Sequence, residues 1–191
     1  MQESTTWVGL DVHQEQIVVA LYQGRSRKAT EFRVGNDERG IGQLVRRLRK
    51  AGGRVECCYE AGPCGYALQR RLEAAGIGCA VVAPSLIPVK PGERVKTDRR
   101  DARKLAELVR GGLLTAVCAP SEEQEAVRDL CRCREDARED LMRSRHRLSK
   151  MLLRRGHVFR AGSNWTHKHR RWLLSLKWEH AADAVVFGDY L

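Results

Sequence analysis

Trp7-Val-Gly-Leu-Asp-Val-His-Gln-Glu-Gln-Ile-Val-Val-Ala-Leu-Tyr22 contains two runs of β-forming residues, 7–12 and 16–22, separated by three polar residues. A third run, 28–34, follows the polar segment 23–27. Runs of β-branched, aromatic and other apolar residues between polar or glycine-containing segments are typical of short strands. The sequence therefore predicts two consecutive hairpins.

Beyond these hairpins the apolar pattern alternates between helices and strands. Asp37 can cap a helix whose apolar residues recur at helical spacing, and a strand at 54–59 follows. A second helix carries Leu68 and Leu72 before a strand at 77–83, the prolines within 84–97 predict a loop, and a third helix covers 98–111. This element order predicts an α/β ribonuclease-H-like fold, a mixed sheet flanked by helices.

Residues 121–155 contain neither proline nor glycine, and Ser121 with Gln124 fits a capping box. A long helix is predicted, with a coiled-coil-like apolar stripe at Val127, Leu130, Ala137, Leu141, Leu148 and Met151. One helix cannot bury this stripe alone, so we expect it to pack against another helix of the same or a second protomer. A further amphipathic helix is expected within 164–176. We expect a first domain at 1–118 and a helical segment at 119–191.

The positive charge is concentrated in one segment. The 191 residues include 35 Lys and Arg against 24 Asp and Glu, a formal net charge of +11. Residues 141–178 hold 11 of the basic residues and no acid, so the remainder, 24 basic against 24 acidic residues, is balanced. This segregation favours a polyanionic partner such as nucleic acid. The alternative is a solvated helical face.

Cysteine usage and apolar runs exclude several classes of protein. The seven cysteines are odd in number and form no Cys-x-x-Cys pair, which argues against a disulfide framework and a zinc site. No apolar segment is long enough to span a bilayer, and the first residues do not resemble a signal peptide. We therefore expect a reduced, soluble, cytoplasmic protein.

Four carboxylates occupy positions where metal-binding acids gather. Asp11 ends the first predicted strand and Glu60 follows the strand at 54–59, so parallel pairing of these strands places the two acids side by side. Asp98 and Asp101 lie one turn apart on one face of the next helix. Clustered like charges require a cation, and hard oxygen ligands suit Mg²⁺ or Mn²⁺. A structural alternative makes Asp98 the helix N-cap and Asp101 its third-position partner.

Four motifs occur in order: Trp7-Val-Gly-Leu-Asp-Val-His13, Tyr59-Glu-Ala-Gly-Pro-Cys-Gly-Tyr66, Val82-Ala-Pro-Ser-Leu-Ile-Pro88 and Arg94-Val-Lys-Thr-Asp-Arg-Arg-Asp-Ala102. Together they resemble the N-terminal domain of the DEDD insertion-sequence transposases that are guided by a bridge RNA. The resemblance extends through the long helix to residues 164–172. It implies a RuvC-like fold in which Asp11, Glu60, Asp98 and Asp101 are the catalytic, Mg²⁺-binding acids.

The same resemblance implies the partners. The protein would insert or excise a mobile element by DNA strand cleavage and exchange guided by RNA, and the long helix would assemble dimers or tetramers. In this family the chain continues into a second domain that supplies a serine nucleophile. We expect the residues after Trp178 to be too few to form that domain. This chain would then hold the metal half of a composite site, with no membrane partner.

Basic residues in two regions are candidate nucleic-acid contacts. The first group surrounds the paired aspartates and comprises Lys96, Arg99, Arg100, Arg103 and Lys104. The second group lies in the long helix and comprises Arg143, Arg147, Lys150, Arg154 and Arg155. Trp165 and Trp172 are either stacking platforms or, more commonly, helix-packing residues.

Other interpretations stay open. A RuvC-like structure-specific endonuclease would use the same four acids with metal-activated water. In a non-catalytic RNA- and DNA-binding oligomerisation module, the acids would only hold a structural ion, and the basic segment 141–178 would contact the nucleic acid. An actin-like ATPase is disfavoured, because Val12-His-Gln14 offers no glycine for phosphate contacts. His13 is a general base, a metal-shell group or a hydrogen-bonded turn residue.

Overall fold

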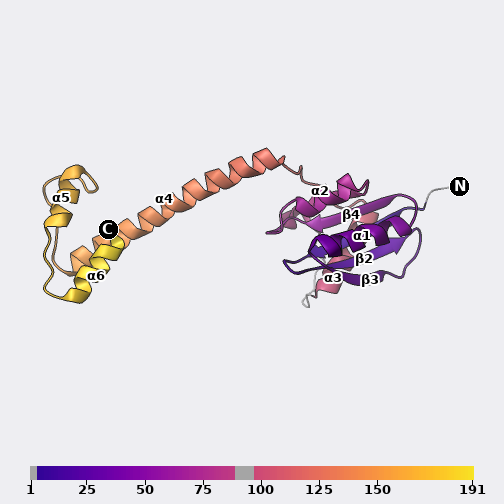
Figure 1. Cartoon of the computed structure of the whole chain (residues 1–191), viewed down its shortest axis with the longest axis horizontal. Coiled ribbons are helices and arrows are strands. Elements are labelled where there is room, and N and C mark those ends of the chain that lie inside the picture. Colours follow the sequence, from indigo (N-terminus) through magenta and orange to yellow (C-terminus); the bar gives the residue numbers. More distant parts are fainter. Residues whose placement is uncertain (1–3, 89–96) are drawn as a thin grey trace. The chain divides into compact units, whose positions relative to one another are not determined.

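The computed structural model describes residues 4–88 and 97–191. They form two compact units that divide between Ala119 and Pro120 (Figure 1). The first unit is a mixed sheet flanked by helices, and the second contains a long helix, so the predicted fold class is confirmed. Within the described ranges, no helix is long and apolar enough to cross a membrane.

A five-stranded sheet forms the centre of the first unit. Its strands are β1 (Thr6–Val12), β2 (Gln16–Gln23), β3 (Thr30–Gly35), β4 (Val55–Glu60) and β5 (Gly78–Val82), in the order β3-β2-β1-β4-β5. β3, β2 and β1 pair antiparallel, which confirms the two predicted hairpins. β4 runs parallel to both β1 and β5. The first strand therefore lies beside the strand that follows the first helix.

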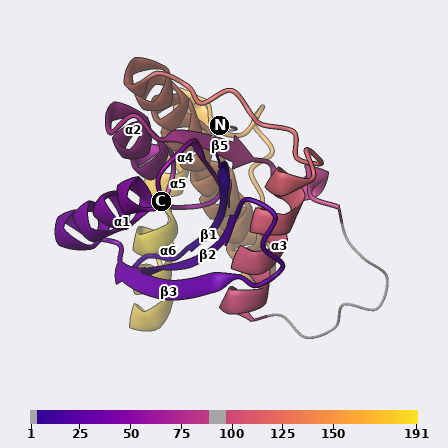
Figure 2. The same cartoon turned by 90° about the vertical axis from the view of Figure 1, so that its right-hand side faces the viewer.

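Helices cover both faces of this sheet. They are α1 (Glu38–Lys50), α2 (Ala67–Ala74), the short 3₁₀ helix η1 (Pro84–Leu86) and α3 (Asp98–Arg110). α1 and α2 lie on one face and α3 on the other, as Figure 2 shows. Asp37 caps α1 as predicted, because its side chain accepts a 2.6 Å hydrogen bond from the Gly40 N–H. The main core, which includes Leu44 and Leu72, lies between the sheet and helices α1 and α2.

Gly9 allows α3 to pack directly on β1. A Cβ atom at Gly9 would lie 2.0 Å from the carbonyl oxygen of Ala102 and 2.5 Å from the backbone nitrogen of Ala106. At these distances the atoms would overlap, so only glycine permits such a close approach of the helix backbone. Ala102 and Ala106 are fully buried, and their small side chains permit the same approach from the helix side.

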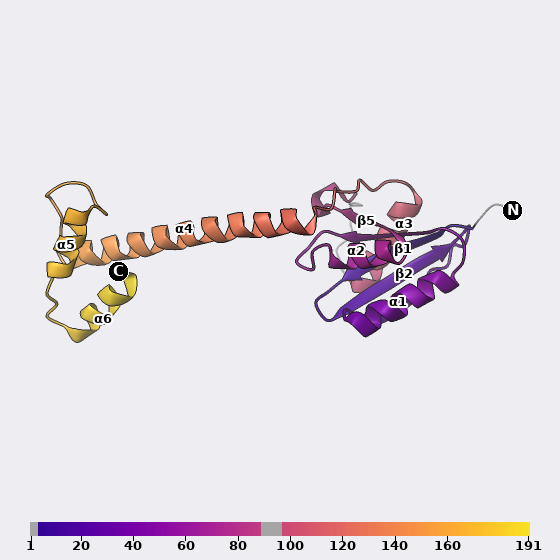
Figure 3. The ribbon, with the colours of Figure 1, turned by 45° about the horizontal axis from the view of Figure 1, so that its top comes forward.

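Three helices make up the second unit. They are α4 (Glu122–Arg154), α5 (His167–Ser175) and α6 (Ala181–Tyr190). The predicted capping box at Ser121 and Gln124 is present. α5 and α6 pack against the C-terminal end of α4 (Figure 3), where Leu148, Leu173 and Phe187 share a core.

The apolar stripe of α4 is covered within its own unit only near its C-terminal end. Leu148 and Met151 are buried against the other two helices of the unit. Val127, Leu130 and Leu141 are 56%, 71% and 50% exposed. The second unit by itself thus leaves most of the predicted stripe without a partner helix among the described residues.

Alanine at Gly9 is expected to lower the free energy of unfolding by about 1–3 kcal/mol, because the added Cβ forces α3 away from β1. Gly42→Ala is the matched control: a Cβ there would meet a flexible Arg46 side chain at 3.6 Å, and alanine favours a helix by about 0.5–1 kcal/mol. Urea unfolding of the full chain, followed by circular dichroism, measures both changes. Equal stability of Gly9→Ala and the parent would show that α3 does not rest on this residue.

Candidate metal site

Asp11 and Glu60 stand at the same edge of the sheet. β1 and β4 pair in parallel with Leu10 opposite Tyr59, which makes Asp11 and Glu60 the next residues in register. Leu10 and Tyr59 are buried in the core beneath α1 and α2. Strand alternation therefore turns the side chains of Asp11 and Glu60 to the opposite face, where α3 packs.

The first turn of α3 carries the other two predicted acids. Asp98 and Asp101 both lie in this turn, and the N-cap is Thr97, whose side chain accepts a 3.4 Å hydrogen bond from the Arg100 N–H. The alternative prediction that Asp98 is the N-cap is therefore wrong. The helix start does not need either carboxylate for capping, although both gain modest stabilisation from the helix dipole.

Asp11, His13 and Asp98 form a compact group. His13 Nε2 lies 2.9 Å from Asp11 Oδ2, a hydrogen-bond distance, and 3.8 Å from Asp98 Oδ1. One potential ligand atom from each residue lies within 4.8 Å of the other two. The His13 backbone is fixed at the β1–β2 turn, because its N–H donates to Gln16 and its carbonyl accepts from Asn36 Nδ2 at 2.7 Å. These hydrogen bonds fix the position of His13 between the two carboxylates, and the three side chains could share one metal ion.

The surroundings of Asp11 oppose its negative charge. Burial raises the pKa of Asp11 above the ordinary value of 3.8, and the charges of Asp98 and Asp101 raise it further, whereas the hydrogen bond to His13 lowers it. A bound cation would offset both the burial and the repulsion. The electrostatics of this edge therefore favour a cation.

The structure brings two of the four predicted acids into this group. Among the described residues, the potential ligands found together are Asp11, His13 and Asp98. Asp101 acts on Asp11 through its charge, and Glu60 is an exposed residue at the end of β4. From the sequence, three roles are open to His13: general base, metal-shell group and hydrogen-bonded turn residue. The signal that points to it is its position two residues after Asp11, which places both on one face of an extended strand.

The predicted nucleic-acid contacts near these acids differ in their surroundings. Arg103 forms an ion pair with Glu31. Arg99 and Arg100 are exposed at the first turn of α3, and Lys104 is half-buried on the same helix. Lys96 lies outside the described residues.

Four of the predicted contacts on α4 share one face of the helix. We call them the α4 cation row: Arg143, Arg147, Lys150 and Arg154. Their spacing of four, three and four residues aligns them along the helix. Arg143 pairs with Glu139 and Asp140. In the part of the chain that the structure describes, the other three have no carboxylate partner.

Arg155 and the two tryptophans have packing roles in the second unit. Arg155 binds Asp183 through two hydrogen bonds of 2.7 and 2.9 Å, which tie α6 to the end of α4. This ion pair lowers the pKa of the Asp183 carboxyl. Trp165 and Trp172 are partly buried against the core of the unit, as the packing alternative predicts.

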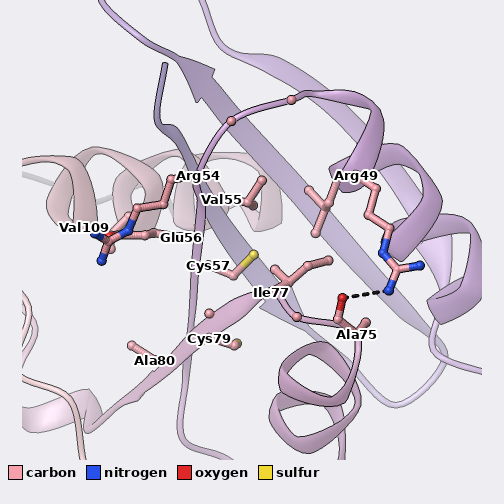
Figure 4. A pocket seen from close by; sticks show the side chains of 15 residues that line it. Arg49, Arg54, Val55, Glu56, Cys57, Ala75, Ile77, Cys79, Ala80 and Val109 are labelled. Atoms are coloured by element: carbon pink, nitrogen blue, oxygen red, sulfur yellow. Dashed lines mark hydrogen bonds and ion pairs between the residues drawn. The ribbon is translucent and has the colours of Figure 1, made fainter. Parts of the chain in front are cut away.

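A cavity in the first unit lies away from the four predicted metal-binding acids. It has a volume of about 710 Å³ and is lined by residues around the amino ends of β4 and β5 (Figure 4). Arg49 donates to the Ala75 carbonyl oxygen, and Arg54 pairs with Glu56 there. The residues that line this cavity include none of the predicted acids. The His13 and Asp98 side chains are instead 46% and 42% exposed, so the candidate metal site is open to a large substrate.

Comparison with known proteins gives a consistent result. The family model of the DEDD transposases of IS110 elements matches residues 8–155. The chain is 40% identical over 185 residues to the putative transposase y4qE of Sinorhizobium fredii and 38% identical over 187 residues to the transposase for insertion sequence element IS1533 of Leptospira borgpetersenii. Each alignment covers 96% of this chain but 47% and 54% of the respective relative. The chain thus spans about half the length of the curated relatives it matches.

Proposed function

The chain belongs to the DEDD transposase family of IS110 elements, and from this premise we propose that it provides the metal-binding half of a transposase that cleaves and exchanges DNA strands. One observation carries the proposal. Asp11 at the end of β1 and Asp98 at the start of α3, distant in the sequence, converge on one open face. Such convergence of like charges is costly unless it binds a cation.

Asp11 and Asp98 would hold the metal ion, and Glu60 at the end of β4 and Asp101 in the first turn of α3 would complete the predicted four-acid set. Carboxylate oxygens suit Mg²⁺, which usually keeps several water ligands, so direct bonds from all four acids are not required. The same carboxylate oxygens also suit Mn²⁺. His13 also orients the Asp11 carboxylate through its 2.9 Å hydrogen bond.

A divalent cation held by Asp11 and Asp98 would supply electrostatic stabilisation of the charge that develops on a scissile phosphate. The resemblance to bridge-RNA-guided transposases supports a composite active site, in which a second domain supplies a serine nucleophile. On the same basis a guide RNA selects the DNA, and the chain contributes to insertion or excision of the mobile element.

The second unit is the proposed assembly and nucleic-acid segment, and residues 1–118 are the proposed catalytic domain. The exposed stripe residues Val127, Leu130 and Leu141 support assembly through α4, because burial of such a row requires another helix. A second copy of α4 is the simplest partner and gives a dimer, from which a tetramer can form. The α4 cation row supports contacts with phosphates of RNA or DNA.

Calorimetric titration of the full chain with Mg²⁺ and Mn²⁺ tests the metal site. We expect the parent to bind, and Asp11→Asn and Asp98→Asn to weaken binding by about tenfold or more, because each removes an anionic ligand. Glu60→Gln is expected to weaken it as well. Asp136→Asn, on an exposed position of α4, is the matched control. Equal metal affinities for the parent and all variants would show that the acids only pair with neighbouring charges. This result would favour a non-catalytic nucleic-acid-binding module.

Replacement of Arg147 and Arg154 by glutamine tests the α4 cation row. The slope of log affinity against log salt concentration is expected to fall by about two, because each phosphate contact contributes about one. The control is Arg132→Gln with Arg138→Gln, which removes equal charge from cations already paired with carboxylates on α4. Fluorescence anisotropy with an RNA or DNA duplex measures both slopes. An unchanged slope for the variant with glutamine at Arg147 and Arg154 would show that the α4 cation row does not contact the nucleic acid.

A further inference from the structure

A small pocket lies beside α5 and the C-terminal part of α4, within the second unit. Its volume is about 210 Å³, below the roughly 300–1,000 Å³ of pockets that take drug-sized ligands. Its size therefore suits one flat ring system. Its lining includes Ser149, Lys150, Phe159, Asn164, His169 and Trp172.

Aromatic rings form an ordered part of the lining. The Phe159 ring lies 4.9 Å from the His169 ring and 5.3 Å from the Trp172 ring, centroid to centroid. The His169 and Trp172 rings stack with 24° between their planes. His169 Nδ1 accepts a 3.0 Å hydrogen bond from the Trp165 backbone N–H, and burial lowers the His169 pKa, which favours the neutral ring. A fixed, uncharged aromatic surface of this kind is suited to stacking with a nucleobase.

Polar groups accompany the aromatic surface. Asn164 is exposed and offers both a donor and an acceptor, the combination that a base edge requires, and the Ser149 hydroxyl adds another of each. Lys150 belongs to the α4 cation row and has no carboxylate partner within the described ranges. The surrounding segment 141–178 contains no acidic residue. The pocket thus combines a stacking surface, base-edge groups and a cation for an adjoining phosphate.

We propose that this pocket binds one unpaired base of a nucleic-acid strand, with the base stacked on Phe159 and Lys150 at the neighbouring phosphate. This inference rests on the proposed nucleic-acid function of the α4 cation row and adds a preference for single strands. Bases within a duplex are already paired and stacked, so they cannot enter a pocket of this size. An apolar side chain of a protein partner would leave the polar lining without a role.

Binding of a short oligonucleotide that carries one 2-aminopurine tests the pocket. The full chain is titrated with this probe as single-stranded RNA, as single-stranded DNA and as the matching duplex, and anisotropy and 2-aminopurine emission are recorded. We expect both single strands to bind more tightly than the duplex, with quenched emission from stacking. Tighter binding of the RNA strand would identify a guide as the source of the base, and tighter binding of the DNA strand would identify the substrate.

Phe159→Leu retains apolar volume but removes the ring. It is expected to weaken single-strand binding by about tenfold, to restore the emission and to leave duplex affinity unchanged. Lys150→Gln is expected to lower the single-strand salt slope by about one, whereas Lys177→Gln, which removes the same charge outside the pocket lining, should not. Asn164→Ala, on an exposed loop residue, provides a second test of single-strand affinity if Phe159→Leu alters the circular dichroism spectrum.

Two results would overturn the inference while leaving the cation row intact. The first is single-strand affinity and emission that are unchanged in both Phe159→Leu and Asn164→Ala. The second is an equal loss of single-strand and duplex binding in these variants. Absence of any binding by the parent chain would overturn both the pocket and the proposed nucleic-acid function of the second unit.

Discussion

The contact of α3 with β1 at Gly9 is the constraint on which the candidate metal site depends. A Cβ atom at this position would lie 2.0 Å from the Ala102 carbonyl oxygen, so the helix can approach only a glycine. This approach places the first turn of α3 at the end of β1, where Asp98 lies 3.8 Å from His13 and His13 lies 2.9 Å from Asp11. A larger residue would lift the helix and separate the two carboxylates. Stability of the first unit and metal binding are therefore coupled through one residue.

The first unit is largely predictable because its signals are local. Short polar connections between β-forming runs leave few ways to pair the first three strands, and helical spacing of apolar residues identifies the helices. α6 has no such signal: its N-cap, His180, makes no side-chain hydrogen bond, and Asp183 is buried on it. Asp183 is tolerated there because Arg155, 28 residues earlier, pairs with it. Local patterns cannot reveal a pairing that only the tertiary fold creates.

The candidate metal site is likewise predictable from the sequence only in part. The positions of Asp11 at a strand end and Asp98 at a helix start identify them from the sequence. The N-cap of α3, however, is Thr97, and sequence spacing alone does not distinguish Thr97 from Asp98 as the capping residue. The place of His13 between the two carboxylates depends on the β1–β2 turn and on the position of α3, both of which are features of the folded chain. The α4 cation row is visible in the sequence, and so are the partners of Arg143, which lie three and four residues earlier on the same helix. The partner of Arg155 is not, because it lies 28 residues away. Residue type therefore indicates the chemistry, and tertiary contacts decide which residues are available for it.

Anomalous scattering from crystals of the chain grown with Mn²⁺ is the most direct test of the claim that this packing builds a metal site. The signal locates the ion without any assumption about its ligands. We predict a strong peak bonded to carboxylate oxygens of Asp11 and Asp98, with His13 beside it. Manganese bound only elsewhere, or no peak while Asp11 keeps its hydrogen bond to His13, would contradict the claim.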